Sequence, residues 1–136
     1  MQIQYLATFG RIILGLYFLA AGTGKIFGPV ALPQVEHMTA NGVPFAEVMF
    51  VLAGACETIA GICFIIGLHT RLVAILLALF TVLVSIVLHA FWKETGHDQF
   101  IQMMMFLKNI ATAAGLLGFA GFGSGPLAVD RIYEGK

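Results

Sequence analysis

Three charged residues lie inside long apolar stretches of this 136-residue sequence: Arg11, Glu57 and Lys108. A guanidinium, a carboxylate and an ammonium group can hydrogen-bond a ligand, relay protons or form an ion network. Each is costly to place in hydrocarbon, so such residues normally face the interior of a helix bundle or a water-filled cavity. These three positions therefore indicate where chemistry is to be sought.

Each of these charges shares a helical face with small or polar residues, and a fourth apolar stretch carries a polar face of its own. In chain order the faces are Arg11, Gly15, Phe18 and Gly22; Gly54, Glu57 and Gly61; Thr81, Ser85, His89 and Trp92; Lys108, Ala111, Thr112 and Gly115. Small residues let membrane helices approach closely. We expect all four faces to point inward, toward one another.

The rise of an α-helix gives the expected depth of these groups in a membrane. Glu57 would lie about 15 Å and Arg11 about 9 Å from one side, and Lys108 about 14 Å from the other. Glu57 is therefore expected to reach Arg11 or Lys108, as one carboxylate between two cations. His89 is expected nearer the surface beside Trp92, whose indole suits a membrane interface.

Two interpretations of the buried charges remain open. An ion network would lock the bundle, because an unpaired buried charge is strongly destabilising. Alternatively, a polar chamber would bind a small molecule, a quinone head group or protons. No histidine has metal-ligand spacing, so no metal site is predicted. Cys56 and Cys63 would stand about 10 Å apart on one helix, too far for a disulfide.

Composition shows which elements must position these groups. The chain is 60% hydrophobic and only 10% charged, with a mean hydropathy of +0.96, whereas a soluble domain has about 25% charged residues. Four segments reach the length of about 20 apolar residues that a spanning helix needs: 5–24, 45–67, 72–92 and 99–122. The predicted fold is all-α, a single-domain integral membrane four-helix bundle in the lipid bilayer. Zero net charge predicts no nucleic-acid partner.

The connections predict neighbours and orientation. Residues 67–71 form a short turn, which makes the second and third spans antiparallel neighbours. Residues 32–40 are expected to form a short interfacial helix. Positive charges set the orientation of a membrane protein. The side that holds both termini carries four positive charges, Arg11, Arg71, Arg131 and Lys136, whereas the opposite side carries Lys25 and Lys93. This excess predicts that both termini lie in the cytoplasm.

Together these features resemble the DoxX family of small four-helix membrane proteins. The resemblance covers nearly the whole chain and rests on Gly10-Arg11, Gly24-Lys25, Asn41-Gly42-Val43-Pro44, Glu57, Gly67-Leu68-His69-Thr70-Arg71, His89-Ala90-Phe91-Trp92 and Phe106-Leu107-Lys108-Asn109. The segment 123–126, followed by Asp130, is close to the family's ending, although its Gly-Pro-Gly-like turn is permuted. The resemblance implies a multi-pass protein of the bacterial cytoplasmic membrane.

The resemblance also implies a redox-associated role. The family takes its name from a subunit associated with thiosulfate:quinone oxidoreduction, and other members are linked to oxidative-stress defence or detoxification. It has no agreed catalytic residue set. The candidate ligand-binding residues are Arg11, Glu57, His89, Lys108 and Asn109, with Lys25, Arg71 and Trp92 as secondary candidates.

No Cys cluster or paired-His haem pattern supplies an intrinsic redox cofactor. The chain is therefore expected to act as an accessory or quinone-interacting subunit with an oxidoreductase partner, rather than as an enzyme by itself. Two alternatives remain: a small-molecule or proton-coupled carrier, and a purely structural membrane scaffold. Four spans are few for a carrier unless the chain forms homo-oligomers.

Overall fold

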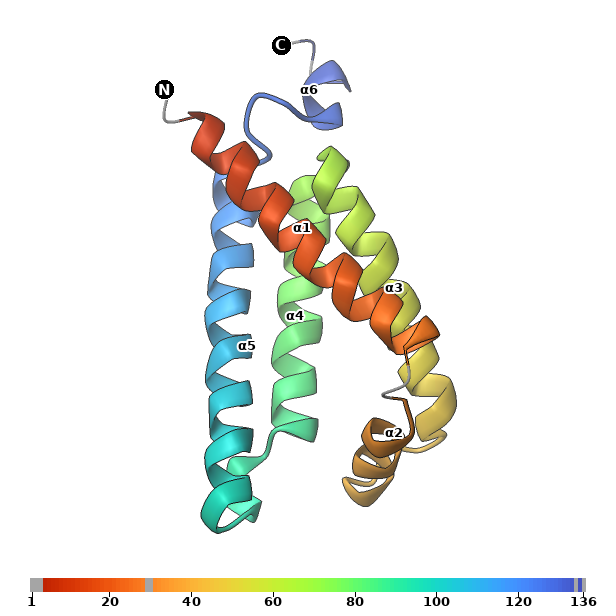
Figure 1. Cartoon of the computed structure of the whole chain (residues 1–136). Coiled ribbons are helices and arrows are strands. Elements are labelled where there is room, and N and C mark those ends of the chain that lie inside the picture. The colour runs from red at the N-terminus through yellow and green to blue at the C-terminus, as the bar shows by residue number, and fades with distance from the viewer. Residues whose placement is uncertain (1–3, 29–30, 134, 136) are drawn as a thin grey trace.

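The computed structural model describes residues 4–28, 31–133 and 135. Within them, four helices are long and apolar enough to cross a membrane. These are α1 (Gln4–Phe27), α3 (Ala46–Ile66), α4 (Thr70–Leu88) and α5 (Gly96–Phe122), shown in Figure 1. The shorter elements are α2 (Ala31–Ala40), the 3-10 helix η1 (Phe91–Lys93) and α6 (Val129–Tyr133). The predicted all-α membrane bundle is confirmed.

The bundle has two distinct ends. The start of α1, the α3–α4 turn (67–69), the last turn of α5 and α6 gather at one end, which we call the terminal end (Figure 1). The helix α2 and η1 lie at the opposite end, which we call the α2 end. The short helix α2 was expected over almost the same residues.

The spanning helices pack as two pairs, α1 along α3 and α4 along α5. In the first pair the glycines oppose one another. A Cβ atom added to Gly61 would lie 2.6 Å from the backbone N of Leu19 and 2.8 Å from the carbonyl oxygen of Gly15. Gly22 meets the backbone of Gly54 in the same way. The small-residue faces predicted for these two helices therefore do form a close contact.

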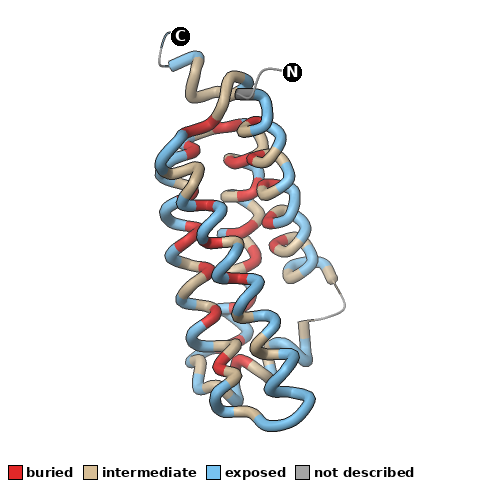
Figure 2. The backbone as a smooth tube through the Cα atoms, turned by 90° about the vertical axis from the view of Figure 1, so that its left-hand side faces the viewer, coloured by how far each residue is buried: buried red, intermediate tan, exposed pale blue. Residues whose placement is uncertain are grey.

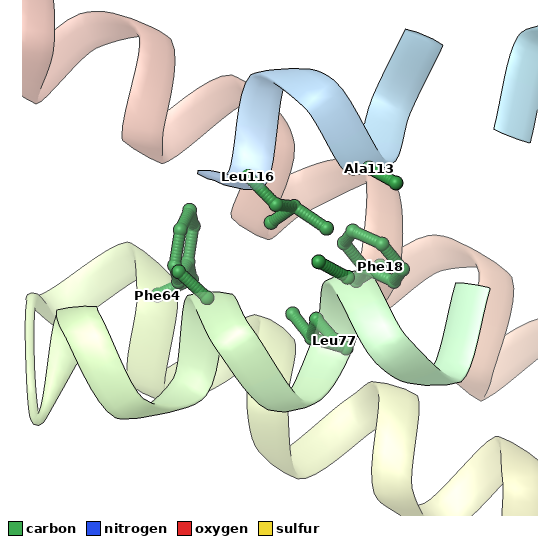
Figure 3. Packing of buried hydrophobic residues seen from close by; sticks show 7 residues of the cluster. Phe18, Phe64, Leu77, Ala113 and Leu116 are labelled. Atoms are coloured by element: carbon green, nitrogen blue, oxygen red, sulfur yellow. The ribbon is translucent and has the colours of Figure 1, made fainter. Parts of the chain in front are cut away.

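An apolar core joins the two pairs in the half nearest the terminal end. It consists of Phe18, Phe64, Ala74, Leu77, Ala78, Ala113 and Leu116, shown from close by in Figure 3. Buried positions lie on the inner faces of the helices in Figure 2. Large apolar side chains such as Phe9, Leu76 and Leu83 are exposed on the outside, as a surface in contact with lipid requires.

The α3–α4 turn follows from its sequence. Gly67 adopts φ +72°, and the N–H groups of Gly67 and Leu68 donate to the carbonyls of Phe64 and Cys63, at 3.3 and 2.8 Å. This is a Schellman motif, in which glycine takes the left-handed position without strain. The turn is so short that α4 has to run back antiparallel to α3.

Two expected helix ends differ from the structure. The first span was expected to end at residue 24, but α1 continues to Phe27 and so carries Lys25 on its inner surface. The third span was expected to stay helical to residue 92. The chain leaves α4 at His89, with φ −114° and ψ 43°. Trp92 therefore lies in η1, and its expected place on the helical face of Thr81 and Ser85 was wrong.

Candidate functional site

A cavity of about 750 Å³ lies between the two helix pairs, in the half of the bundle toward the α2 end. The helices diverge there, beyond the core cluster, so that Phe18 forms part of the cavity wall as well as of the core. Residues of α2, among them His37 and Met38, line the cavity at its other end. Its surface is largely apolar, with polar side chains contributed by five helices.

The cavity brings together most of the predicted site residues. Four of the five principal candidates line it, and so does one secondary candidate: Glu57, His89, Lys108, Asn109 and Lys25. These residues come from α1, α3, α5 and the end of α4. Thr81 lines the same space from α4. The polar residues predicted on inner faces of α3 and α4 thus border one volume. The inner face predicted for α5 was wrong: Lys108, Ala111 and Gly115 are exposed, and the buried residues of α5 are Asn109, Ala113 and Leu116.

Glu57 lines the cavity and forms an ion pair with Lys25. The Nζ atom of Lys25 lies 2.6 Å from Oε2 of Glu57, and the two side chains are 23% and 10% exposed. The expected partner was Arg11 or Lys108. Arg11 is excluded because the antiparallel pairing of α1 and α3 places it level with Gly67, ten residues or about 15 Å along α3 from Glu57.

Lys108 is the second cation at the cavity. Its Nζ atom lies 5.7 Å from the ring centroid of Tyr17 on α1, a distance typical of a cation–π contact. Lys108 and Lys25 both line the cavity with Glu57, but among the described residues the carboxylate forms an ion pair with Lys25 alone. A lysine at the centre of a spanning helix costs about 2.5–3.5 kcal/mol in membrane insertion, so its place here calls for compensation.

Two histidines line the cavity toward the α2 end. Nδ1 of His89 lies 2.8 Å from Oε1 of Gln102, which accepts the ring proton in that orientation. Nε2 of His37 donates to the carbonyl oxygen of Leu88 at 2.8 Å and so ties α2 to the end of α4. His37, Gln102 and Tyr17 were not among the predicted site residues. Of these three, His37 and Gln102 could have been identified as site residues only from their polarity near helix ends.

Arg11 and Arg71 lie outside the cavity, at the terminal end. Arg11 is 1% exposed, and its Nη2 atom donates to the carbonyl oxygen of Leu127 at 2.5 Å. Arg71 donates through Nη1 to the carbonyls of Ala120 and Gly121, at 2.9 and 2.6 Å. Arg71 thus binds carbonyls in the last turn of α5, and Arg11 binds a carbonyl in the segment after α5. These hydrogen bonds hold the C-terminal segment against the bundle.

Asp130 of α6 adds hydrogen bonds that also hold the C-terminal segment to the bundle. Its carboxylate accepts hydrogen bonds from the backbone N–H groups of His69 at 2.6 Å and Thr70 at 2.9 Å. Its own N–H donates to the carbonyl oxygen of Gly67 at 2.9 Å. The side chain of His69 makes no cap for α4, so the carboxylate of Asp130 acts as the N-terminal cap from a distant part of the chain.

Trp92 also lies outside the cavity wall. It is 53% exposed and packs edge-on against Phe91 and Phe106, with ring centroids 5.2 and 5.9 Å away. Such a position suits an aromatic residue at a membrane interface. Among the residues that the structure describes, no three His, Cys, Asp or Glu side chains are placed to hold a metal ion.

Comparisons with known proteins identify one family and two similar inner membrane proteins. The DoxX family model matches residues 6–90. The inner membrane protein YqjF of Escherichia coli K12 is 32% identical over 126 residues, which cover 93% of this chain and 90% of that protein. The inner membrane protein YphA of the same organism is 30% identical over 121 residues, covering 89% and 85%. No solved structure matches the chain.

Proposed function

Because the chain belongs to the DoxX family and is a multi-pass protein of the bacterial inner membrane, we propose that its cavity binds a quinone head group. In this role the protein is a quinone-interacting accessory subunit of a membrane redox or detoxification system. The observation that carries the proposal is the cavity itself, where polar side chains of several spanning helices meet inside an apolar wall.

The size and lining of the cavity suit such a ligand. Small-molecule sites commonly measure about 300–1,000 Å³ and are mostly apolar, with a few polar groups that orient the ligand. The volume of about 750 Å³ falls in that range. A quinone has the matching composition: a ring with two carbonyl acceptors on an isoprenoid tail that prefers hydrocarbon.

The lining residues divide into donors and proton carriers. Lys108 and Asn109 would donate hydrogen bonds to a quinone oxygen from adjacent positions on α5. Asn109 is only 7% exposed, and among the described residues its side-chain amide makes no hydrogen bond. In this proposal Glu57 and His89, which line the same cavity, would take up or release protons. Arg11, expected as an alternative donor, lies at the other end of the bundle.

In this proposal the quinone ring is the group that is reduced and oxidised. The electrons that reduce it must come from another protein. We therefore propose that a soluble or membrane oxidoreductase docks on this protein, which holds the quinone for it. Affinity purification from a quinone-using bacterium, with quantitative mass spectrometry, tests this part. A redox enzyme enriched in stoichiometric amounts supports it, and enrichment of no such enzyme contradicts it.

Cys56 offers a direct test of quinone binding because it lines the cavity, whereas Cys63 on the same helix does not. The protein is placed in lipid nanodiscs and titrated with a fully substituted benzoquinone that carries a decyl tail, since a ring without free positions does not add to thiols. The rates at which N-ethylmaleimide modifies both cysteines are measured by mass spectrometry. We expect saturable slowing at Cys56 alone.

Two variants of α5 sharpen this experiment. Asn109→Leu removes a proposed donor and should raise the quinone concentration needed for protection. Thr112→Val is the matched control, because Thr112 lies outside the cavity wall and its hydroxyl donates only to the carbonyl oxygen of Lys108. Unprotected Cys56 at saturating quinone, in a folded protein, would disprove quinone binding.

The apolar core bears on the carrier alternative. Phe64, Leu77 and Leu116 fill the bundle between the cavity and the terminal end, so this conformation favours a binding site reached from one end or from the bilayer over a path across the membrane. Flux measurements in proteoliposomes, with Glu57→Gln as the control, test the carrier. Flux that Glu57→Gln abolishes would favour the carrier over the quinone-binding role.

A further inference from the structure

Lys108 differs from the other cations of the spanning helices. Lys25 is paired with Glu57, and Arg11 and Arg71 are bonded to backbone carbonyls. Among the described residues, the ammonium group of Lys108 makes no hydrogen bond and no ion pair. Its Nζ atom lies over the face of the Tyr17 ring, 5.7 Å from the centroid.

The depth of Lys108 makes this isolation significant. Lys108 is the thirteenth of the 27 residues of α5, about 18 Å from one end of the helix and about 21 Å from the other. Near the middle of a membrane neither water nor phospholipid head groups are at hand to pair with the charge. A partner for this ammonium group therefore has to come into the bundle.

Exposed residues of two helices border the cavity at this position. Tyr17 on α1 and Met105 and Lys108 on α5 all line the cavity, and all three are exposed. We call the line between these residues the α1–α5 seam. The outer surface at this depth faces lipid, so the seam connects the cavity to the hydrocarbon of the bilayer.

The charges around the cavity do not balance. The charged residues that line it are Lys25 on α1, Glu57 on α3 and Lys108 on α5, and the histidines are His37 on α2 and His89 after α4. With both histidines neutral, one positive charge is left over. Because Lys25 and Glu57 neutralise each other, the excess positive charge is that of Lys108, at the α1–α5 seam.

We infer that the cavity takes a free single-chain amphiphile with an anionic head group, which pairs with Lys108 while its apolar chain extends through the α1–α5 seam. This rests on the proposed function only in that the same cavity holds the polar head of a membrane-soluble ligand. A phospholipid fits less well, because its head is kept at the membrane surface, about 15 Å from the midplane.

The test compares an anionic ligand with neutral ligands of similar tail length. The protein in phosphatidylcholine nanodiscs at pH 8 is titrated separately with dodecanoate, with dodecanol and with the decyl-tailed benzoquinone, and modification of Cys56 is followed with Cys63 as internal reference. We expect dodecanoate to protect Cys56 at concentrations about tenfold or more below dodecanol, the effect of one charge-assisted hydrogen bond.

Two variants assign the preference to its residue. Lys108→Met should remove the advantage of dodecanoate over dodecanol and leave the helical circular dichroism unchanged. Lys93→Met is the control, because Lys93 is an exposed lysine near the same end of the bundle that does not line the cavity. It should retain the full preference.

The outcomes separate this inference from the proposed function. Equal protection by dodecanoate and dodecanol, or a preference that survives in Lys108→Met, overturns the anionic ligand class while protection by the quinone still supports the cavity's role. Protection by phosphatidylglycerol in the nanodisc without dodecanoate overturns the choice of a single-chain ligand. Protection by none of these compounds overturns both proposals.

Discussion

Lys25 and Glu57 form an ion pair across a contact between two glycines. The Nζ–Oε2 distance is 2.6 Å, and one helical turn away Gly22 and Gly54 bring the backbones of α1 and α3 together. A Cβ atom on Gly54 would lie only 3.0 Å from Cβ of Lys25. The close approach at the glycines thus sets which lysine meets the carboxylate, and both residues of the pair line the cavity.

The first prediction concerns the strength of this pair. Glu57→Leu should lower the free energy of unfolding by about 2 kcal/mol, below the roughly 3–5 kcal/mol of a fully buried pair, because Lys25 lies near the end of α1 and can extend toward water. Lys25→Met/Glu57→Leu should recover most of the loss. Equilibrium unfolding of the two single variants and the double variant, in mixed micelles, gives the coupling. Additive losses would show that the two residues do not stabilise each other.

The second prediction concerns the glycine contact. Gly61→Ala should destabilise the protein by about 1–3 kcal/mol, because the new methyl group would meet the backbone of Leu19 and Gly15, which cannot move aside. Gly118→Ala on α5 is the control, since a Cβ there has nothing within 4 Å. It should stabilise the helix by up to about 1 kcal/mol. The same effect from both substitutions would contradict close packing of α1 on α3.

Much of the fold could be predicted because its signals are local. Four apolar stretches, a Gly67 turn and glycines at helical spacing are visible in the sequence, and they correspond to spans, an antiparallel connection and a helix contact. The end of α4 was missed. His89 lies in an apolar run and carries no Gly or Pro signal, and the helix ends where the side chain meets Gln102 on the next helix.

The site was predictable only in part, because pairing between helices depends on their register. Periodicity predicted inner faces for Glu57 and Lys108; both line the cavity, but Glu57 is buried whereas Lys108 is exposed. It did not show that α1 and α3 align Arg11 with Gly67 and Lys25 with Glu57. The role of α2 in lining the cavity, through His37, is likewise a contact between distant segments.

The third prediction concerns pH and the cap on α4. Burial raises the pKa of Asp130, but the hydrogen bonds from the backbone N–H groups of Thr70 and His69 outweigh it and hold the pKa below its ordinary value. A carboxylate with a lowered pKa in the folded state stabilises the protein above its unfolded pKa, near 3.9. This stabilisation is lost as the pH falls through the folded pKa.

Asp130→Ala should therefore be less stable than the wild type at pH 7, by about 1 kcal/mol or less for a partly exposed cap. The gap should stay constant down to about pH 5 and shrink as the pH falls toward 3 and below. Thermal unfolding of both proteins across this range, followed by circular dichroism, measures it. A gap of the same size at pH 3 and pH 7 would rule out the ionised carboxylate as its source.

The fourth prediction separates the two ends of the bundle. Arg11→Met removes the hydrogen bond to the carbonyl oxygen of Leu127, which ties the C-terminal segment to α1. A hydrogen bond from a charged donor contributes about 1.5–3 kcal/mol, so amide hydrogen exchange in residues 125–131 should become about 10- to 100-fold faster. Lys93→Met, at the α2 end, should leave this exchange unchanged.

The same variant tests whether Arg11 belongs to the ligand site. Arg11 lies about 15 Å along the bundle from Glu57, beyond the core residues Phe64 and Leu116. Its removal should therefore leave the protection of Cys56 by the decyl-tailed quinone within about twofold of the wild type, whereas Asn109→Leu should weaken it. Because only Asn109 of these two lines the cavity, loss of quinone protection in a folded Arg11→Met protein would contradict the location of the site.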